Sequence, residues 1–306
     1  MNDNRPSLPE LITAPHPDVA PLPPAAQCGS VHVLRGVPYA NVADSRPLEL
    51  DLWLPESAGA GHGPVPLVLF VHGGAWRRGR RDDMGLRTRQ WTPGPFARIA
   101  AAGLAVACVD YRLSGEARFP APLDDLRAAL RWLTVRSAEL GIDTGRTVVW
   151  GESAGGHLAS LLALTHAGAA LAGPSVAGAA LAGAVVWYGP SDLATPRGGY
   201  DPYDPATPEA MLVGAAPATV PDRAAAAGPV AQVHPGAPPF LLVHGEEDTM
   251  VSCTHSEALA ARLKEAGAPV ELWTVPGADH GWHGLPDTGV EAIFARSLDF
   301  ARRVVT

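Results

Sequence analysis

Short apolar segments alternate with longer amphipathic ones from about residue 31 onward. Several short segments are apolar on both faces, which is typical of central strands covered by helices on either side. The longer segments carry apolar residues at helical spacing; in 122–140 four leucines fall on one face, and Gly141 ends the run. The predicted strands are 48–54, 65–71, 104–110, 147–150, 184–187, 240–243 and 270–274, and the other predicted helices are 154–166, 255–266 and 287–303.

This alternation predicts an α/β fold with a mostly parallel central sheet and helices on both faces. Two segments depart from the pattern. Residues 1–45 begin with a proline-rich stretch that shows no period, so they are predicted to be an N-terminal arm that could be part of a lid. Residues 191–238 are rich in Pro, Ala, Gly and Asp and are too long for a plain loop, so they are predicted to be a lid insertion. The main domain is then 46–306.

Composition narrows the class of protein. Of the 306 residues 47% are hydrophobic and 18% are charged, which excludes a chain that is disordered throughout. The net charge of −8 argues against a nucleic-acid partner. No apolar run is long enough to cross a membrane, and the first residues lack the pattern of a secretory signal. We therefore expect a cytoplasmic protein with no membrane partner; nothing in the sequence argues against a homo-oligomer.

A five-residue pattern follows the predicted strand 147–150. It is G-E-S-A-G at 151–155, a G-x-S-x-G motif between a strand and a helix. The turn is too tight for bulky neighbours, so glycines flank the serine. It places Ser153 at the tip of the sheet, beside the free N–H groups of a helix N-terminus that favour developing negative charge. Ser153 is therefore the predicted nucleophile.

A second pattern, H-G-G-A-W, follows the predicted strand 65–71. Two consecutive glycines at a strand end let backbone N–H groups point into a site without a Cβ in the way. A serine nucleophile needs such donors to hold the oxyanion that forms in its reaction. We predict an oxyanion hole made by the N–H groups of Gly73, Gly74 and Ala154.

Three further motifs follow in order: V-D-Y-R-L at 109–113, H-G-E-E-D at 244–248 and D-H-G at 279–281. The whole set resembles the α/β-hydrolase superfamily. It is most similar to a serine carboxylesterase branch that includes hormone-sensitive-lipase-like, feruloyl-esterase-like and kynurenine-formamidase-like hydrolases. The resemblance covers roughly residues 45–303 and implies an α/β-hydrolase fold with a small lid.

The resemblance also implies the two partners of the serine. Asp248 matches the acid of the catalytic triad and His280 its base, each in a loop after a predicted strand. Glu246 and Glu247 are the alternative acids, and the pattern H-G-x-x-D-x-x-V favours Asp248 over them. His283 is the alternative base, and the Gly-Ala-Asp turn before His280 favours His280.

Four aromatic residues lie at the predicted functional edge of the sheet and are candidates for substrate binding: Trp76, Trp187, Tyr188 and Trp282. The histidines are scattered and form no zinc motif, and the three cysteines cannot build a four-ligand site. No glycine-rich phosphate loop follows the first strand. We therefore expect no metal and no cofactor.

Four arginines between residues 77 and 81 follow the second glycine motif. One interpretation is a solvated surface loop balanced by Asp82 and Asp83. The other is a mouth that attracts anionic substrates. The first is favoured, because charge runs are usually solvated.

The sequence thus predicts a serine hydrolase that cleaves small-molecule carboxylic esters of short or medium acyl chain through an acyl-enzyme on Ser153. An amide-directed hydrolase such as an arylformamidase would use the same residues. An acyl-transferring or cyclising biosynthetic enzyme would replace water with an alcohol or amine. A silent ligand-binding module is a remote alternative, because such modules usually lack a triad member.

Overall fold

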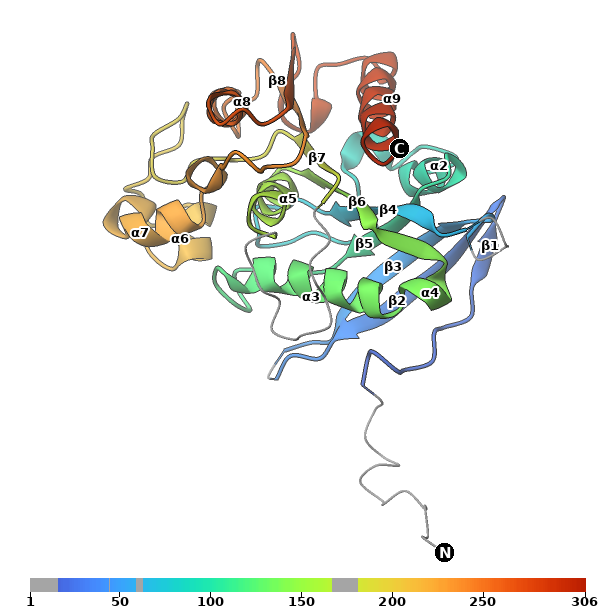
Figure 1. Ribbon diagram of the computed structural model, residues 1–306. Helices are drawn as coiled ribbons and strands as arrows, with labels where there is room; N and C mark the ends of the chain where they lie inside the picture. The colour runs from blue at the N-terminus through green and yellow to red at the C-terminus, as the bar shows by residue number, and fades with distance from the viewer. Residues whose placement is uncertain (1–15, 44, 59–62, 167–180) are drawn as a thin grey trace, which may run out of the picture.

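The computed structural model describes residues 16–43, 45–58, 63–166 and 181–306. It contains one nine-stranded sheet with the order β1-β2-β3-β5-β4-β6-β7-β8-β9 (Figure 1). The pairs from β5 to β9 are parallel, and those from β1 to β5 are antiparallel. The strands are β1 (Ala26–Cys28), β2 (Val31–Ala40), β3 (Leu48–Pro55), β4 (Val65–Val71), β5 (Ala105–Val109), β6 (Ile142–Glu152), β7 (Gly183–Trp187), β8 (Phe240–Gly245) and β9 (Val270–Val275).

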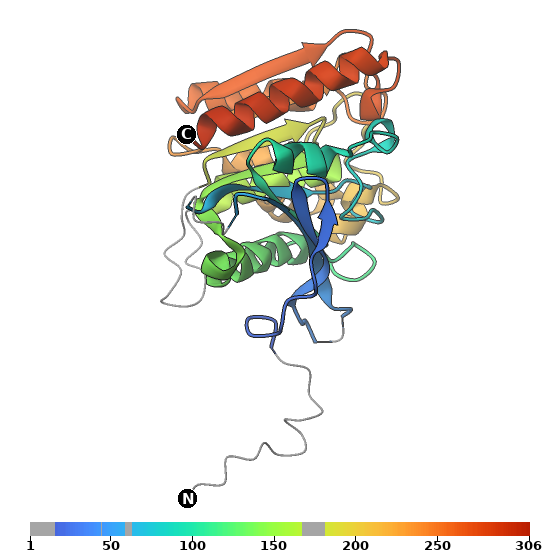
Figure 2. The ribbon, with the colours of Figure 1, turned by 90° about the vertical axis from the view of Figure 1, so that its right-hand side faces the viewer.

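Helices cover both faces of this sheet. The α-helices are α2 (Pro95–Ala101), α3 (Ala121–Val135), α4 (Ser137–Leu140), α5 (Ala154–Thr165), α6 (Pro208–Val213), α7 (Pro221–Ala226), α8 (Thr254–Glu265) and α9 (Asp287–Val304). Figure 2 shows α9 beside the last strands and α3 beside the first ones. Short 3₁₀ turns are η1 (Leu86–Thr88), η2 (Pro217–Thr219), η3 (Pro229–Gln232) and η4 (His280–Trp282).

The core consists of two apolar layers, one on each side of the sheet. In β4, Leu67 and Leu69 face the layer formed with α3, α5 and α8, whereas Val68 and Phe70 face the layer formed with α2 and α9. Alternate side chains of a strand point to opposite faces, so a fully buried strand must be apolar throughout. This explains the continuous apolar runs of the sequence and confirms the predicted α/β fold.

The N-terminal arm is shorter than predicted. Residues 26–40 form β1 and β2 of the sheet, and the side chains of Val33, Val37 and Tyr39 are buried. Alternation along β2 is broken by register shifts, one of them around Gly36, which adopts a φ of 63°. Because the bulge interrupts the regular alternation of apolar and polar residues, the strand was not predicted from the sequence. Residues before 16 lie outside the described part of the chain.

The predicted lid insertion has its own structure. It contains α6, η2, α7 and η3, and η3 packs on α5. The predicted helix 122–140 is two helices, α3 and α4, separated at Arg136. Whether 191–238 acts as a lid stays a prediction.

Candidate active site

Ser153 lies in the turn between β6 and α5. Its φ of 53° and ψ of −122° are strained for a residue with a side chain. A Cβ on Gly151 would collide with the Gly155 carbonyl, and one on Gly155 would collide with the Val71 carbonyl. Both glycines are therefore required for β4, β6 and α5 to approach this closely. The Ser153 N–H donates to the Trp187 carbonyl at 2.9 Å, which ties the turn to β7.

Asp248 and His280 come to Ser153 from the loops after β8 and β9. His280 Nε2 lies 3.0 Å from Ser153 Oγ, and His280 Nδ1 lies 2.7 Å from Asp248 Oδ2. The two loops are packed together, because a Cβ on Gly245 would collide with the Ala278 carbonyl. The structure thus joins the three predicted residues in one hydrogen-bonded chain, from a hydroxyl through an imidazole to a carboxylate.

The Asp248 carboxylate is fully buried and held on several sides. Its Oδ1 accepts the N–H groups of Met250 at 2.9 Å and Val251 at 2.7 Å. Burial alone would raise the pKa of Asp248, but hydrogen bonds from His244 and His280 and the charge of His280 outweigh it and hold the pKa well below its usual range. Asp248 is therefore held as a carboxylate against Nδ1 of His280.

Among the described residues, no side-chain hydrogen bond joins the alternatives Glu246, Glu247 and His283 to the three residues. The Glu246 carboxylate is exposed and accepts from Thr274 Oγ1 at 2.8 Å. His283 contributes its carbonyl to the Asp279 N–H at 2.8 Å. Asp279 accepts the N–H of Thr249 at 2.8 Å and that of His280 at 2.7 Å, so it braces the acid loop against the histidine loop.

One predicted oxyanion donor is already engaged. The Gly73 N–H donates to Glu152 Oε1 at 2.7 Å, so its assignment to the oxyanion hole needs correction. The hydrogen bonds of the described residues give the N–H groups of Gly74 and Ala154 no protein acceptor, and the same holds for Ala75. Gly74 and Ala75 have φ values of 114° and 56°, so the loop turns in the left-handed region after Gly73.

Glu152 links the serine turn to the glycine loop. Burial raises the pKa of Glu152, while the Gly73 N–H, the charge of His280 and a hydrogen bond with Tyr188 act in the opposite direction. A Cβ on Gly73 would collide with the Glu152 carboxylate. The residue beside the nucleophile therefore fixes the start of the predicted oxyanion loop.

The four predicted substrate-binding aromatics are buried. Trp76, Trp187, Tyr188 and Trp282 are between 0 and 2% exposed. The Tyr188 ring packs on the His280 ring with centroids 4.6 Å apart, and Trp282 packs on Tyr188 at 4.7 Å. Trp187 donates its indole N–H to Ser297 of α9 at 2.9 Å and belongs to the core, and substrate contact by the four aromatics stays a prediction. Tyr188 therefore packs directly against His280, and Trp282 packs against Tyr188.

The sequence analysis missed His157. Its Nδ1 accepts the indole N–H of Trp76 at 3.2 Å, and its Nε2 lies 2.6 Å from the carbonyl of Ala227. Burial lowers the pKa of His157 to about 4, so the ring is neutral and its Nε2–H donates to Ala227. This ring joins the glycine loop to the 191–238 insertion. The only signal for it was its position one turn after Ser153.

Arg87 was also missed. Its guanidinium donates to the carbonyls of Trp282 at 2.8 Å and Leu285 at 2.9 Å, just after His280 in the chain. It also pairs with Asp287, whose side chain is 90% exposed. The loop it holds contains Gly281, Trp282 and Gly284 with positive φ. Arg87 therefore holds the loop that carries His280.

The described residues contain neither a metal-binding cluster nor a membrane-spanning helix. Within residues 16–43, 45–58, 63–166 and 181–306, no group of three or more His, Cys, Asp and Glu residues could hold a metal ion. None of the helices in these ranges has the length and apolar character needed to cross a membrane.

The sequence is similar to one family model and to several esterases. The BD-FAE family model matches residues 50–263. Esterase LipQ of Mycobacterium tuberculosis is 31% identical over 235 residues, which are 76% of this chain and 54% of LipQ. Carboxylesterase NlhH of the same organism is 43% identical over 101 residues, 32% of this chain and 29% of NlhH. The chain spans about half the length of LipQ and less of NlhH.

Solved structures show the same fold. A truncated carbohydrate esterase from gut microbiota superposes with a TM-score of 0.75 at 26% identity, over 89% of this chain and 96% of the other. Thermogutta terrifontis esterase 2 superposes with a TM-score of 0.70 at 21% identity, over 91% and 96%. The sheet order, the strained serine turn and a family match over most of the sequence agree, and the chain belongs to the BD-FAE family, with the α/β-hydrolase fold.

Proposed function

We propose that this protein is a serine hydrolase that cleaves carboxylic esters of short or medium acyl chain through an acyl-enzyme on Ser153. The observation that carries the proposal is the continuous hydrogen-bonded chain from Ser153 Oγ through His280 to Asp248. These three hydrogen-bonded residues lie at the carboxyl ends of β6, β8 and β9, where open α/β sheets hold their sites.

In the first half of the reaction, His280 Nε2 accepts the proton of Ser153 Oγ while that oxygen attacks the ester carbonyl. Asp248 accepts Nδ1–H, which leaves Nε2 free as the base, and stabilises the imidazolium that forms. His280 then gives its proton to the departing alcohol. In the second half, His280 accepts a proton from water while the water oxygen attacks the acyl carbonyl. The bond to Ser153 Oγ then breaks, the acid leaves, and His280 returns the proton to Ser153.

The oxyanion of each tetrahedral intermediate needs fixed donors. Because Gly73 donates to Glu152, we assign this role to the N–H groups of Gly74 and Ala154, with that of Ala75 as a third. Loss of one such donor lowers kcat by about 10²–10³-fold in a comparable site.

The relatives support ester substrates. Among the similar proteins are esterases, carboxylesterases and an ethyl acetate hydrolase of Pseudomonas putida, and a carbohydrate esterase shares the fold. The two α-helices of the 191–238 insertion are six residues each, which favours a small acyl group over a lipid aggregate. Cytoplasmic location, oligomeric state and the absence of a nucleic-acid partner stay predictions from the sequence.

The test is hydrolysis of p-nitrophenyl esters from acetate to laurate by the wild type and by Ser153→Ala, with N-formylkynurenine in the same series. We expect the highest kcat/KM at short or medium chains and loss of turnover in the variant. Turnover of the formamide alone would move the enzyme to the amide-directed class. Ester turnover that survives Ser153→Ala in full would refute the proposal.

A further inference from the structure

The loop that carries the proposed oxyanion donors turns back on itself. It leaves β4 at His72 and returns at Gly79, which has a φ of 127°. A Cβ on Gly79 would collide with His72 Nδ1 and the Gly73 carbonyl, and one on Gly74 would collide with the Arg78 carbonyl. The returning limb is therefore in direct contact with the limb that holds Gly74.

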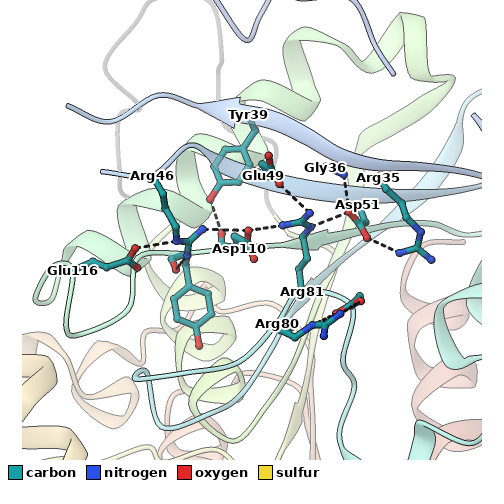
Figure 3. Close-up of polar contacts among 12 residues, drawn as sticks. Arg35, Gly36, Tyr39, Arg46, Glu49, Asp51, Arg80, Arg81, Asp110 and Glu116 are labelled. Carbon is teal, nitrogen blue, oxygen red and sulfur yellow. Dashed lines mark hydrogen bonds and ion pairs between the residues drawn. The ribbon is translucent and has the colours of Figure 1, made fainter. Parts of the chain in front are cut away.

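Arg81 follows that contact by two residues. Its guanidinium lies 2.9 Å from Asp51 Oδ1, 2.6 Å from Asp110 Oδ2 and 3.0 Å from Glu49 Oε2 (Figure 3). Glu49 and Asp51 belong to β3, and Asp110 directly follows β5. One side chain thus ties the returning limb to the ends of two neighbouring strands, with the planar fork geometry that only arginine offers.

The carboxylates that receive Arg81 are themselves fixed. Asp51 is 3% exposed and also accepts Arg35 Nη1 at 2.8 Å and the Gly36 N–H at 2.9 Å. Asp110 also pairs with Arg46 at 3.2 Å. A pocket of about 340 Å³ lies beside the guanidinium, and its lining is mostly charged, with Arg46, Asp51 and Asp110 among the residues. The ion pairs therefore determine where Arg81 sits.

The neighbouring Arg80 provides the contrast. Its side chain is 77% exposed and pairs with Asp82 at 2.7 Å, one residue beyond Arg81. Its hydrogen bonds within the described part of the chain go to Asp82 and none reaches the sheet, so it has the character of a solvated surface charge. The arginine run therefore divides into an exposed Arg80 and an anchored Arg81.

We propose that Arg81 is a positioning residue for the oxyanion hole, fixing the returning limb of the 72–81 loop against the sheet. Glu152 holds the same loop at its start through the Gly73 N–H, so Gly74 and Ala75 lie between two anchors. Release of one anchor lets these N–H groups drift from the oxyanion. Substrate binding outside the loop is unaffected. The inference rests on the proposed esterase function.

The test compares Arg81→Ala and Arg81→Lys with Arg80→Ala as the matched control. For Arg81→Ala we expect kcat for p-nitrophenyl butyrate to fall about 10–100-fold with KM within about twofold, because a misplacement near 1 Å can lower the rate 10²-fold. Arg81→Lys keeps the charge and the fold but reaches fewer carboxylates, so its loss is intermediate. Arg80→Ala keeps the wild-type rate.

A second readout separates positioning from loss of folded protein. A trifluoromethyl ketone adds to Ser153 and places an oxyanion in the hole, so its Ki rises in each Arg81 variant by the factor by which kcat/KM falls. Unfolding followed by circular dichroism gives the folded fraction of each variant. The inference is overturned if both Arg81 variants keep kcat within twofold, if Ki does not follow kcat/KM, or if the loss matches the unfolded fraction. Absence of Ser153-dependent turnover in the wild type and in Arg80→Ala would instead refute the esterase function.

Discussion

Arg87→Ala tests whether Arg87 of η1 holds the loop that carries His280. The substitution removes two hydrogen bonds from a guanidinium to the carbonyls of Trp282 and Leu285. Hydrogen bonds to charged groups contribute about 1.5–3 kcal/mol each, so a loss of about 2–4 kcal/mol in unfolding free energy is expected after water replaces part of them. The freed loop carries His280, so kcat falls about 10–100-fold as the imidazole leaves its place between Ser153 and Asp248.

The matched control is Asp287→Ala. It removes the exposed ion pair of Arg87 and leaves both carbonyl bonds, so the effect on stability stays below about 1 kcal/mol and kcat is unchanged. Urea unfolding and initial rates with p-nitrophenyl butyrate measure the two quantities. Equal behaviour of Arg87→Ala and Asp287→Ala in both assays would refute this role of Arg87, because the carbonyl bonds would then contribute nothing.

Four further predictions concern Asp248 and two residues close to Ser153. Asp248→Asn lowers kcat about 10⁴-fold because Nδ1 loses its acceptor, whereas Glu246→Gln leaves it unchanged; comparable rates would contradict the assignment. The pKa of Asp248 is lower in the folded than in the unfolded state, so its stabilising contribution is complete above about pH 5 and declines as the pH falls below the unfolded value near 3.9. Acid unfolding of Asp248→Asn should therefore be less pH-dependent in this range. Glu152→Ala frees the Gly73 N–H and lowers both melting temperature and kcat, whereas Glu152→Gln keeps an acceptor oxygen and stays closer to the wild type. His157→Leu breaks the bridge from Trp76 to Ala227 and lowers unfolding free energy by about 1–3 kcal/mol, which thermal melting would detect.

The sequence predicts most of the sheet and Ser153 because their signals are local, namely apolar runs and the G-x-S-x-G motif. Asp248 and His280 are predicted through the resemblance of their motifs to the family. Each candidate lies within a few residues of an apolar strand end, and parallel strands bring such ends to one edge. Gly151 and Gly155 mark the serine turn because no other residue fits there. Strand β2 escaped prediction because the bulge near Gly36 interrupts its alternation.

The remaining features depend on contacts between distant parts of the chain. The Gly73 N–H cannot serve the oxyanion hole, because the Glu152 side chain folds against it and accepts its hydrogen bond. Arg81 could be separated from Arg80 only once Asp51 and Asp110 were placed around it. Trp187 has the position of a pocket residue in the sequence, but its side of β7 faces α9. Periodicity and motifs carry no information on such pairings.

The central claim is that Ser153 is the nucleophile of an acyl-enzyme mechanism. Reaction of the wild type and Ser153→Ala with a fluorophosphonate, followed by peptide mass mapping and residual-activity assays, tests it most directly. We predict one covalent adduct per chain, located on Ser153, with loss of ester hydrolysis in proportion to labelling and no adduct on the variant. An adduct on another residue, or full hydrolysis by the fully labelled enzyme, would contradict the account.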